Sequence, residues 1–276
     1  MVKHSPPRGR RRSKRAPTGA LFVVVVWSRC GLSAQKCAAN RSSYTSSLSA
    51  GGIYTRPVPG HILAGGGSSL GGPFDDLVPE LGGRRVCFVP TASATPETRL
   101  VSFYESFARR ADPSHVVFNP WPREDLREHV LAQDAIYVAG GSTANMVAVW
   151  RAHGFDVLLR EAWERGILLC GTSAGMICWF EAGVTDSFGP QLEGMHDLLG
   201  FLPGSACPHY DSEDRRRVVY RVLVDAGFPP GFAADDDAAL HFVGTELREA
   251  LCVREGAQAY RVEPGIETPL ETRFVS

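Results

Sequence analysis

A serine in the stretch "GTSAG" (residues 171–175) stands between small residues, after one apolar run and before another. This G-x-S-x-G spacing is typical of a nucleophile elbow, a strained strand-to-helix turn that lifts the serine hydroxyl clear of a sheet. The alternative is a tight turn that needs small residues only because its backbone is crowded. Ser173 is therefore a candidate nucleophile, and its chemistry would require a base and an orienting acid.

Among the eight histidines, His209 has the context expected of the base. It follows a short apolar segment in "GSACPHYDSED", where a strand would open into a loop. The alternative is a loop histidine that is bonded only to backbone. His196 and His241 also stay open as candidates.

The orienting acid has three candidates, of which Asp186 in "EAGVTDSFGP" is the first choice. Glu181 and Asp211 are its rivals. An aspartate in a Thr-Asp-Ser turn usually caps or shapes the turn, so Asp186 needs geometry that brings it to His209. Asp186 lies 13 residues after Ser173, and His209 lies 36 residues after Ser173. In an ordinary α/β-hydrolase the acid and the histidine lie much farther from the nucleophile in sequence.

The elements that must position these residues begin near residue 60. Short apolar strands alternate there with amphipathic helices, as in "RRVCFVP" followed by "PETRLVSFYESFARR". This alternation predicts an α/β fold, with a mostly parallel sheet and helices on both faces. From about residue 231 onward, short strands separated by turns predict a small antiparallel extension at the sheet edge.

Three glycine-rich segments fall at the carboxyl ends of predicted strands, where functional loops collect in such sheets. They are residues 65–67, 140–142 and 171–175. The first lacks the third glycine of a dinucleotide motif, and no Walker lysine follows it. It is better interpreted as a structural turn or as a loop that lines the site.

Residues 1–58 differ from the rest and are expected to form a basic, low-complexity tail, with the catalytic domain at 59–276. The segment joins a basic stretch to the apolar run "LFVVVVW", which is too short to span a bilayer as a helix. Disorder, an export signal and a start codon assigned too far upstream are the open interpretations.

Charge and cysteine usage argue against several function classes. Eleven of the 29 Lys and Arg precede the first acidic residue, which leaves 18 basic and 30 acidic residues from Asp75 onward, a net charge of −12. So acidic a body is poorly suited to nonspecific nucleic-acid binding. The seven cysteines have no paired C-x-x-C spacing and mostly lie in apolar runs, which favours buried thiols over disulfides or a zinc site.

Four motifs in this order, "YVAGGSTANM", "GTSAGM", "VTDS" and "CPHYD", resemble the peptidase E (aspartyl dipeptidase) and cyanophycinase family of serine peptidases. The resemblance covers about residues 60–265. It implies a class I glutamine-amidotransferase-like fold, a flavodoxin-like sandwich with serine in place of the amidotransferase cysteine. It also implies that Ser173 is the nucleophile, His209 the general base and Asp186 the acid.

The resemblance further assigns the oxyanion hole to the backbone N–H groups of Gly141 and Ala174. An amidotransferase would need cysteine at the elbow, and Cys170 lies three residues too early. Ser142 stands where the family often has asparagine and is a candidate substrate contact. For a substrate carboxylate, Arg215 in "SEDRRR" matches the family's Glu-x-Arg run best. A solvated helix face is the alternative for this arginine triplet.

The expected activity is serine-type hydrolysis of short peptides through an acyl-enzyme, with N-terminal Asp-X dipeptides as the narrower expectation. A cyanophycinase-like hydrolase of β-Asp-Arg chains and a non-catalytic binding module are the alternatives. No metal or cofactor is expected. The expected partner is a small peptide, without nucleic acid or membrane, and a homodimer stays open. The expected location is the cytoplasm, with secretion as the alternative if the N-terminal segment is a signal.

Overall fold

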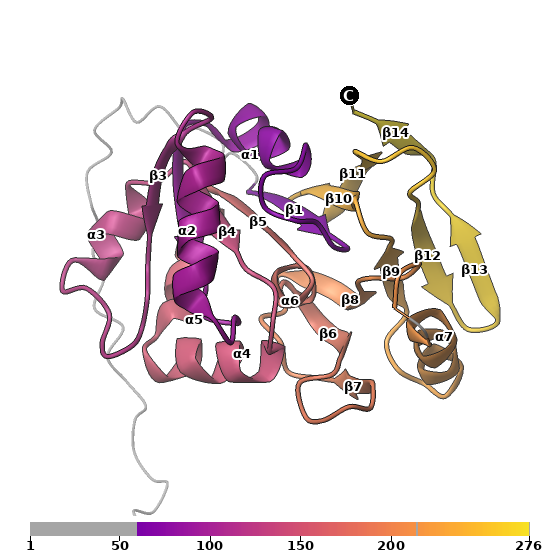
Figure 1. The fold of residues 1–276 in the computed structure, drawn as a ribbon. Coiled ribbons are helices and arrows are strands. Elements are labelled where there is room, and N and C mark those ends of the chain that lie inside the picture. The colour runs from indigo at the N-terminus through magenta and orange to yellow at the C-terminus, as the bar shows by residue number, and fades with distance from the viewer. Residues whose placement is uncertain (1–59, 214, 276) are drawn as a thin grey trace, which may run out of the picture. The chain divides into compact units, whose positions relative to one another are not determined.

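The computed structural model describes residues 60–213 and 215–275 (Figure 1). The predicted tail, residues 1–58, lies outside the described residues. An eight-stranded sheet forms the larger part of the described fold. Its central strands are buried on both faces, which explains their continuous apolar sequence. In order across the sheet, the strands are β14 (Thr272–Phe274), β11 (Glu246–Cys252), β10 (Ala238–Val243), β1 (His61–Gly65), β5 (Leu168–Thr172), β4 (Ala135–Val138), β2 (Arg85–Val89) and β3 (Asp112–His115).

Five neighbouring strands of this sheet, from β1 to β3, run parallel. Strand β10 pairs antiparallel with both β1 and β11, and so extends the sheet beyond β1. The prediction of a mostly parallel sheet with an antiparallel C-terminal extension is confirmed. Because β1, β5 and β4 run parallel side by side, their carboxyl ends meet at one edge, where open α/β sheets bind ligands.

Helices cover both faces of the sheet, as predicted (Figure 1). Along β2, the Phe88 side chain enters one core and Cys87 the other, so the alternating positions are all apolar. Phe88 stacks on Phe103 with ring centroids 4.5 Å apart. The helices are α1 (Phe74–Gly82) and α2 (Pro96–Phe107) on the first face, and α3 (Leu126–Leu131), α4 (Thr143–Ala152), α5 (Phe155–Glu164) and α6 (Ala174–Ile177) on the second.

A second sheet of six strands was not predicted. The strand-to-helix turn expected at residues 171–175 leads into a helix of only four residues, because α6 ends at Ile177 and a strand begins at Phe180. A side chain at Gly183 would stand 2.8 Å from the Ile177 Cβ, so glycine lets this strand lie close to the short helix. Helix α7 (Arg216–Asp225) packs on this sheet. Its strands in order are β13 (Ile266–Pro269), β12 (Ala259–Glu263), β9 (Gly231–Ala234), β8 (Leu202–Cys207), β6 (Phe180–Thr185) and β7 (Glu193–Met195).

The glycine-rich loop after β1 joins the two sheets. The Gly66 carbonyl accepts a hydrogen bond from the His209 N–H at 3.3 Å, and the Gly67 carbonyl accepts one from the Asp237 N–H at 2.6 Å. Gly67 also forms a β-bridge with Asp236. The loop therefore brings the end of β1 against the loops that follow β8 and β9.

Two further sequence expectations concern cysteines and membranes. The five cysteines among the described residues are buried free thiols, as predicted. Within residues 60–213 and 215–275, the helices are all too short or too polar to cross a bilayer.

Candidate active site

Ser173 occupies a strained turn between β5 and α6. Its backbone has φ 59° and ψ −115°, a combination that costs a non-glycine residue about 1–3 kcal/mol and persists where surrounding structure imposes it. The Ser173 N–H donates to the Gly65 carbonyl at 3.1 Å, which ties the turn to the end of β1. The sequence left a crowded turn and a nucleophile elbow open, and the turn has the properties of both.

Small residues around Ser173 are required by close backbone contact with β4. A Cβ at Gly171 or at Gly175 would stand 2.5 or 2.4 Å from the Val138 carbonyl oxygen. A Cβ at Gly140 would stand 3.1 Å from the Ser173 Cβ. The glycines thus allow the serine to stand at the strand ends without a larger side chain covering it.

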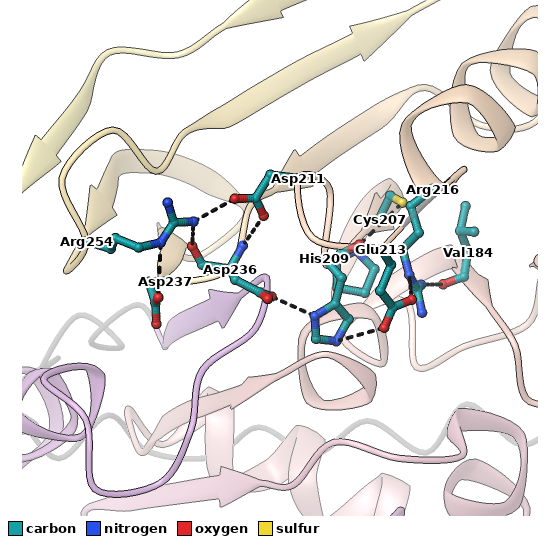
Figure 2. Close-up of polar contacts among 10 residues, drawn as sticks. Val184, Cys207, His209, Asp211, Glu213, Arg216, Asp236, Asp237 and Arg254 are labelled. Atoms are coloured by element: carbon teal, nitrogen blue, oxygen red, sulfur yellow. Dashed lines mark hydrogen bonds and ion pairs between the residues drawn. The ribbon is translucent and has the colours of Figure 1, made fainter.

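His209 lies in the loop after β8 and contacts a carboxylate that is not among the three predicted acids. Its Nδ1 is 2.7 Å from Asp236 Oδ1 (Figure 2). Asp236 follows β9, and because β8 and β9 are parallel neighbours, the loops at their carboxyl ends meet. An ionised carboxylate can only accept a hydrogen bond, so Nδ1 carries the proton and Nε2 is left as the basic nitrogen.

The structure places Asp186, the predicted acid, in an exposed turn. It is exposed in the turn after β6, and among the described residues no hydrogen bond joins it to His209. Its neighbour Ser187 accepts a hydrogen bond from the Ala144 N–H at the start of α4. The Thr-Asp-Ser segment therefore serves the turn and the helix start, which is the common role of such sequences.

The two rival acids also lie elsewhere. The Glu181 carboxylate accepts from the Gly204 N–H at 2.8 Å. Asp211 accepts from the Asp236 N–H at 2.9 Å and pairs with Arg254 at 2.6 Å. Of these four acids, Asp236 is the one hydrogen-bonded to the His209 ring.

Ser173 and His209 line one small pocket of about 150 Å³. Among the described residues no hydrogen bond joins the two side chains, and His209 Nε2 has Glu213 Oε1 4.0 Å away (Figure 2). Catalytic hydrogen bonds are often long without substrate and tighten in the complex, so shared lining of one pocket is the relevant geometry. The pocket is also lined by Ser68, Leu70, Phe88, Arg99, Tyr137, Ala139, Gly140, Gly141 and Thr172.

The predicted oxyanion donors have free N–H groups. Within the described residues, neither the Gly141 N–H nor the Ala174 N–H donates a hydrogen bond. Gly141 adopts φ 137°, and a Cβ there would stand 2.1 Å from the Ala92 carbonyl oxygen, so the position requires glycine. Both groups remain candidates for binding an oxyanion beside Ser173.

Arg99 and Tyr137 add a cation and a phenol to this pocket. Arg99 is exposed on α2, and among the described residues it forms no ion pair. Burial, reinforced by Asp75 and Cys170 nearby, holds the pKa of Tyr137 well above its ordinary value, so its hydroxyl stays protonated and can donate. A larger groove of about 500 Å³, lined partly by His115 and Phe118, includes neither Ser173 nor His209.

The part of the chain that forms most of the eight-stranded sheet and the pocket also matches a known protein family. The sequence profile of peptidase family S51 matches residues 63–250. The chain belongs to peptidase family S51. It is 49% identical to the uncharacterized peptidase YgaJ of Bacillus subtilis over 198 residues, 69% of this chain and 85% of that relative. It is 28% identical to the uncharacterized peptidase Lin0382 of Listeria innocua, over 55% of this chain and 80% of that protein.

Solved structures place this S51 peptidase in the predicted fold class. A peptidase from an acI-B1 actinobacterium aligns with TM-score 0.58 and 18% identity, over 78% of this chain and 96% of that chain. A putative peptidase E protein from Listeria monocytogenes aligns with TM-score 0.50 and 19% identity, over 68% and 96%. These two structures confirm the expected fold class. The family profile and the 49% identity to YgaJ confirm the expected family, and with it the assignment of the chain as a serine peptidase.

The two predicted substrate contacts of the S51 chain lie outside this pocket. Ser142 caps α4, where its hydroxyl accepts from the Asn145 N–H at 3.4 Å. Arg215 is exposed at the start of α7 and does not line the pocket. Its neighbours are engaged structurally, because buried Arg216 pairs with Glu213 and Arg217 pairs with Glu267.

Sequence reasoning missed Asp236, Arg99 and Tyr137. Asp236 had a visible signal, the run of three aspartates that directly follows an apolar segment in "GFAADDDAAL". An acid at the carboxyl end of a strand belongs to the edge where sites form. Arg99 lies in the first turn of α2 and Tyr137 lies within the buried strand β4, positions that carry no such signal.

Proposed function

We propose that this serine peptidase hydrolyses short peptides through Ser173, His209 and Asp236, with N-terminal Asp-X dipeptides as its substrates. The observation that carries the proposal is the strained Ser173 turn in one pocket with His209, whose other ring nitrogen is bonded to Asp236. A nucleophile, a base and an orienter in this relation are the parts that acyl transfer requires.

The mechanism follows from these positions. Ser173 Oγ attacks the scissile carbonyl carbon while His209 Nε2 takes the hydroxyl proton. Asp236 holds the ring through Nδ1–H and stabilises the imidazolium. The same proton then passes to the leaving amine, and water activated by His209 hydrolyses the acyl-enzyme. The N–H groups of Gly141 and Ala174 would bind the oxyanion, and the loss of one such donor typically costs about 3–4 kcal/mol of transition-state stabilisation.

The pocket supports a small, anionic substrate end. Its volume of about 150 Å³ is below the roughly 300–1,000 Å³ of sites for drug-sized ligands, which favours a single residue over a polypeptide segment. Arg99 replaces Arg215 as the proposed carboxylate contact because it lines this pocket. The Tyr137 hydroxyl is a second donor for an anionic side chain.

The first experiment measures hydrolysis of Asp-X dipeptides and Asp-anilides by wild type and Ser173→Ala. Wild type should release product. The rate of Ser173→Ala should be lower by a factor of at least about 10³, because the acyl-enzyme cannot form. Equal rates would refute the mechanism. Cleavage of β-linked Asp-Arg chains alone would point to the cyanophycinase-like alternative. No product from any peptide would favour a binding module.

A second experiment tests the anionic specificity through Arg99→Leu. A hydrogen bond to a charged group contributes about 1.5–3 kcal/mol, so kcat/KM for Asp-X should fall roughly 10- to 150-fold. The rate for the matched Asn-X substrate should change less. Arg109→Leu is the control, because Arg109 is exposed beyond the end of the same helix and does not line the pocket. Equal losses for Asp-X and Asn-X would exclude Arg99 as a carboxylate contact.

A further inference from the structure

The backbone of Asp236 is held on both sides by an ion pair that does not itself touch His209. The Asp236 N–H donates to Asp211 Oδ1 at 2.9 Å. The Asp236 carbonyl accepts from Arg254 Nη2 at 2.8 Å. Asp211 and Arg254 are joined to each other at 2.6 Å, so the two contacts form one closed unit around the aspartate (Figure 2).

This unit connects three segments that are distant in sequence. Asp211 is two residues beyond His209 in the loop after β8, and Arg254 lies in the turn after β11. Arg254 Nε also donates to Asp237 Oδ2 at 3.3 Å, which holds the residue after Asp236. With its N–H and carbonyl both bonded, the Asp236 backbone has one orientation, and its side chain then points at His209 Nδ1 (Figure 2).

We propose that Asp211 and Arg254 are positioning residues that hold the Asp236 carboxylate against His209, an inference that rests on the proposed function. A stabilising role explains the pair less well, because the Asp211 and Arg254 side chains are 34% and 44% exposed. Exposed ion pairs contribute little to stability, since water screens them. Orientation is different, because a misplacement of about 1 Å in a catalytic group can cost about 100-fold in rate.

The test compares Arg254→Met, Arg254→Lys and Asp211→Asn with wild type on an Asp-X substrate. Arg254→Met should lower kcat by about 10- to 100-fold and leave KM within about threefold, because Arg254 is not among the pocket residues. Arg254→Lys should recover part of the loss, since an ammonium can reach Asp211 but cannot bond all three partners in the same geometry. The matched control is Arg273→Met, which breaks an ion pair between Arg273 on β14 and Glu249 on β11 and should keep full activity.

Two readouts separate positioning from a general structural effect. In an Asp236→Asn background, Arg254→Met should add less than about twofold, because the residue acts through the carboxylate already removed. The downfield proton resonance of the His209 Nδ1–H should broaden or vanish in Arg254→Met and persist in Arg273→Met. A loss of equal size in both backgrounds would overturn the proposal, as would wild-type kcat in Arg254→Met.

Asp211→Asn is the second test, for the case that Arg254→Met does not fold. The asparagine side chain still offers an oxygen that can accept from the Asp236 N–H. It should lower kcat about 3- to 30-fold, and an unchanged kcat would count against the positioning role. The Ser173→Ala comparison identifies which idea has failed. If Ser173→Ala matches wild type, the proposed function is wrong. If Ser173→Ala is inactive while the Arg254 and Asp211 variants match wild type, only the positioning role is wrong.

Discussion

Gly67, in the loop after β1, lies against the His209–Asp236 pair, and alanine at this position tests whether activity requires that pair. An added Cβ would stand 1.9 Å from Asp236 Oδ1 and 2.6 Å from His209 Nδ1. The Gly67 φ lies outside the left-handed region, so the backbone itself accepts alanine. The effect of Gly67→Ala should therefore come from contact with the two side chains alone.

The expected magnitude follows from these distances. The carboxylate oxygen would have to retreat by about 1.1 Å to reach even 3.0 Å from the new methyl group. A retreat along the hydrogen bond would lengthen the 2.7 Å contact to about 3.8 Å, beyond hydrogen-bonding distance. Misplacement of this size costs about 10²-fold in rate, and complete loss of the orienting carboxylate about 10⁴-fold. We expect kcat/KM to fall within that interval.

The assay is steady-state hydrolysis of an Asp-X substrate, with thermal unfolding measured in parallel. Gly189→Ala is the control, because an added Cβ there has no atom within 4 Å. The reasoning would be refuted if folded Gly67→Ala kept kcat/KM within threefold of wild type. It would equally be refuted if Gly189→Ala lost as much activity.

Three further predictions concern the orienting acid, a buried aspartate beside it, and the packing of the core. Asp236→Asn should lower kcat about 10⁴-fold, whereas Asp186→Asn should stay within threefold; steady-state kinetics of the pair identifies the acid. Burial raises the pKa of Asp235 to about 6 against 3.8 unfolded, so the folded state holds its proton longer and stability falls as pH rises from about 4 to 6. Asp235→Asn should remove up to about 3 kcal/mol of this dependence in denaturant unfolding at pH 4.5 and 7.5, and parallel curves would contradict it. Phe103→Ala, in a fully buried stack, should cost about 3–5 kcal/mol of unfolding free energy by urea titration, with a cost below 1 kcal/mol counting against the packing.

Local sequence was enough to predict the parallel part of the fold and the strained turn at Ser173. Continuous apolar strands and amphipathic helices have periods that a short window reveals, and Gly171 and Gly175 are needed by a contact with the adjacent strand. The second sheet was not predicted because three of its five strand pairings join segments that are distant in the sequence. Strand β9 joins β8 and β12, and nothing within its four residues indicates either partner.

Contacts between distant segments also explain why the sequence did not predict Asp236 as the acid or Arg99 as the cation of the pocket. The "VTDS" motif makes Asp186 the first choice in the sequence, but contact with a histidine depends on which strand ends are neighbours. Asp236 is 27 residues beyond His209 and still reaches it, because their strands are adjacent. Arg215 was favoured by a motif, whereas the pocket receives Arg99 from a helix much earlier in the chain.

The glycine loop after β1 has a consequence for how this peptidase would lose activity. The proposed nucleophile follows a strand of the eight-stranded sheet, while the proposed base and acid lie in loops of the six-stranded sheet. Gly66 and Gly67 are hydrogen-bonded to those loops. Turnover by the proposed mechanism thus depends on how the two sheets are held against each other, by these loop hydrogen bonds and by the hydrophobic cluster to which both sheets contribute. Warming or mild denaturant that breaks the contacts between the two sheets should abolish activity while most of the secondary structure is still intact.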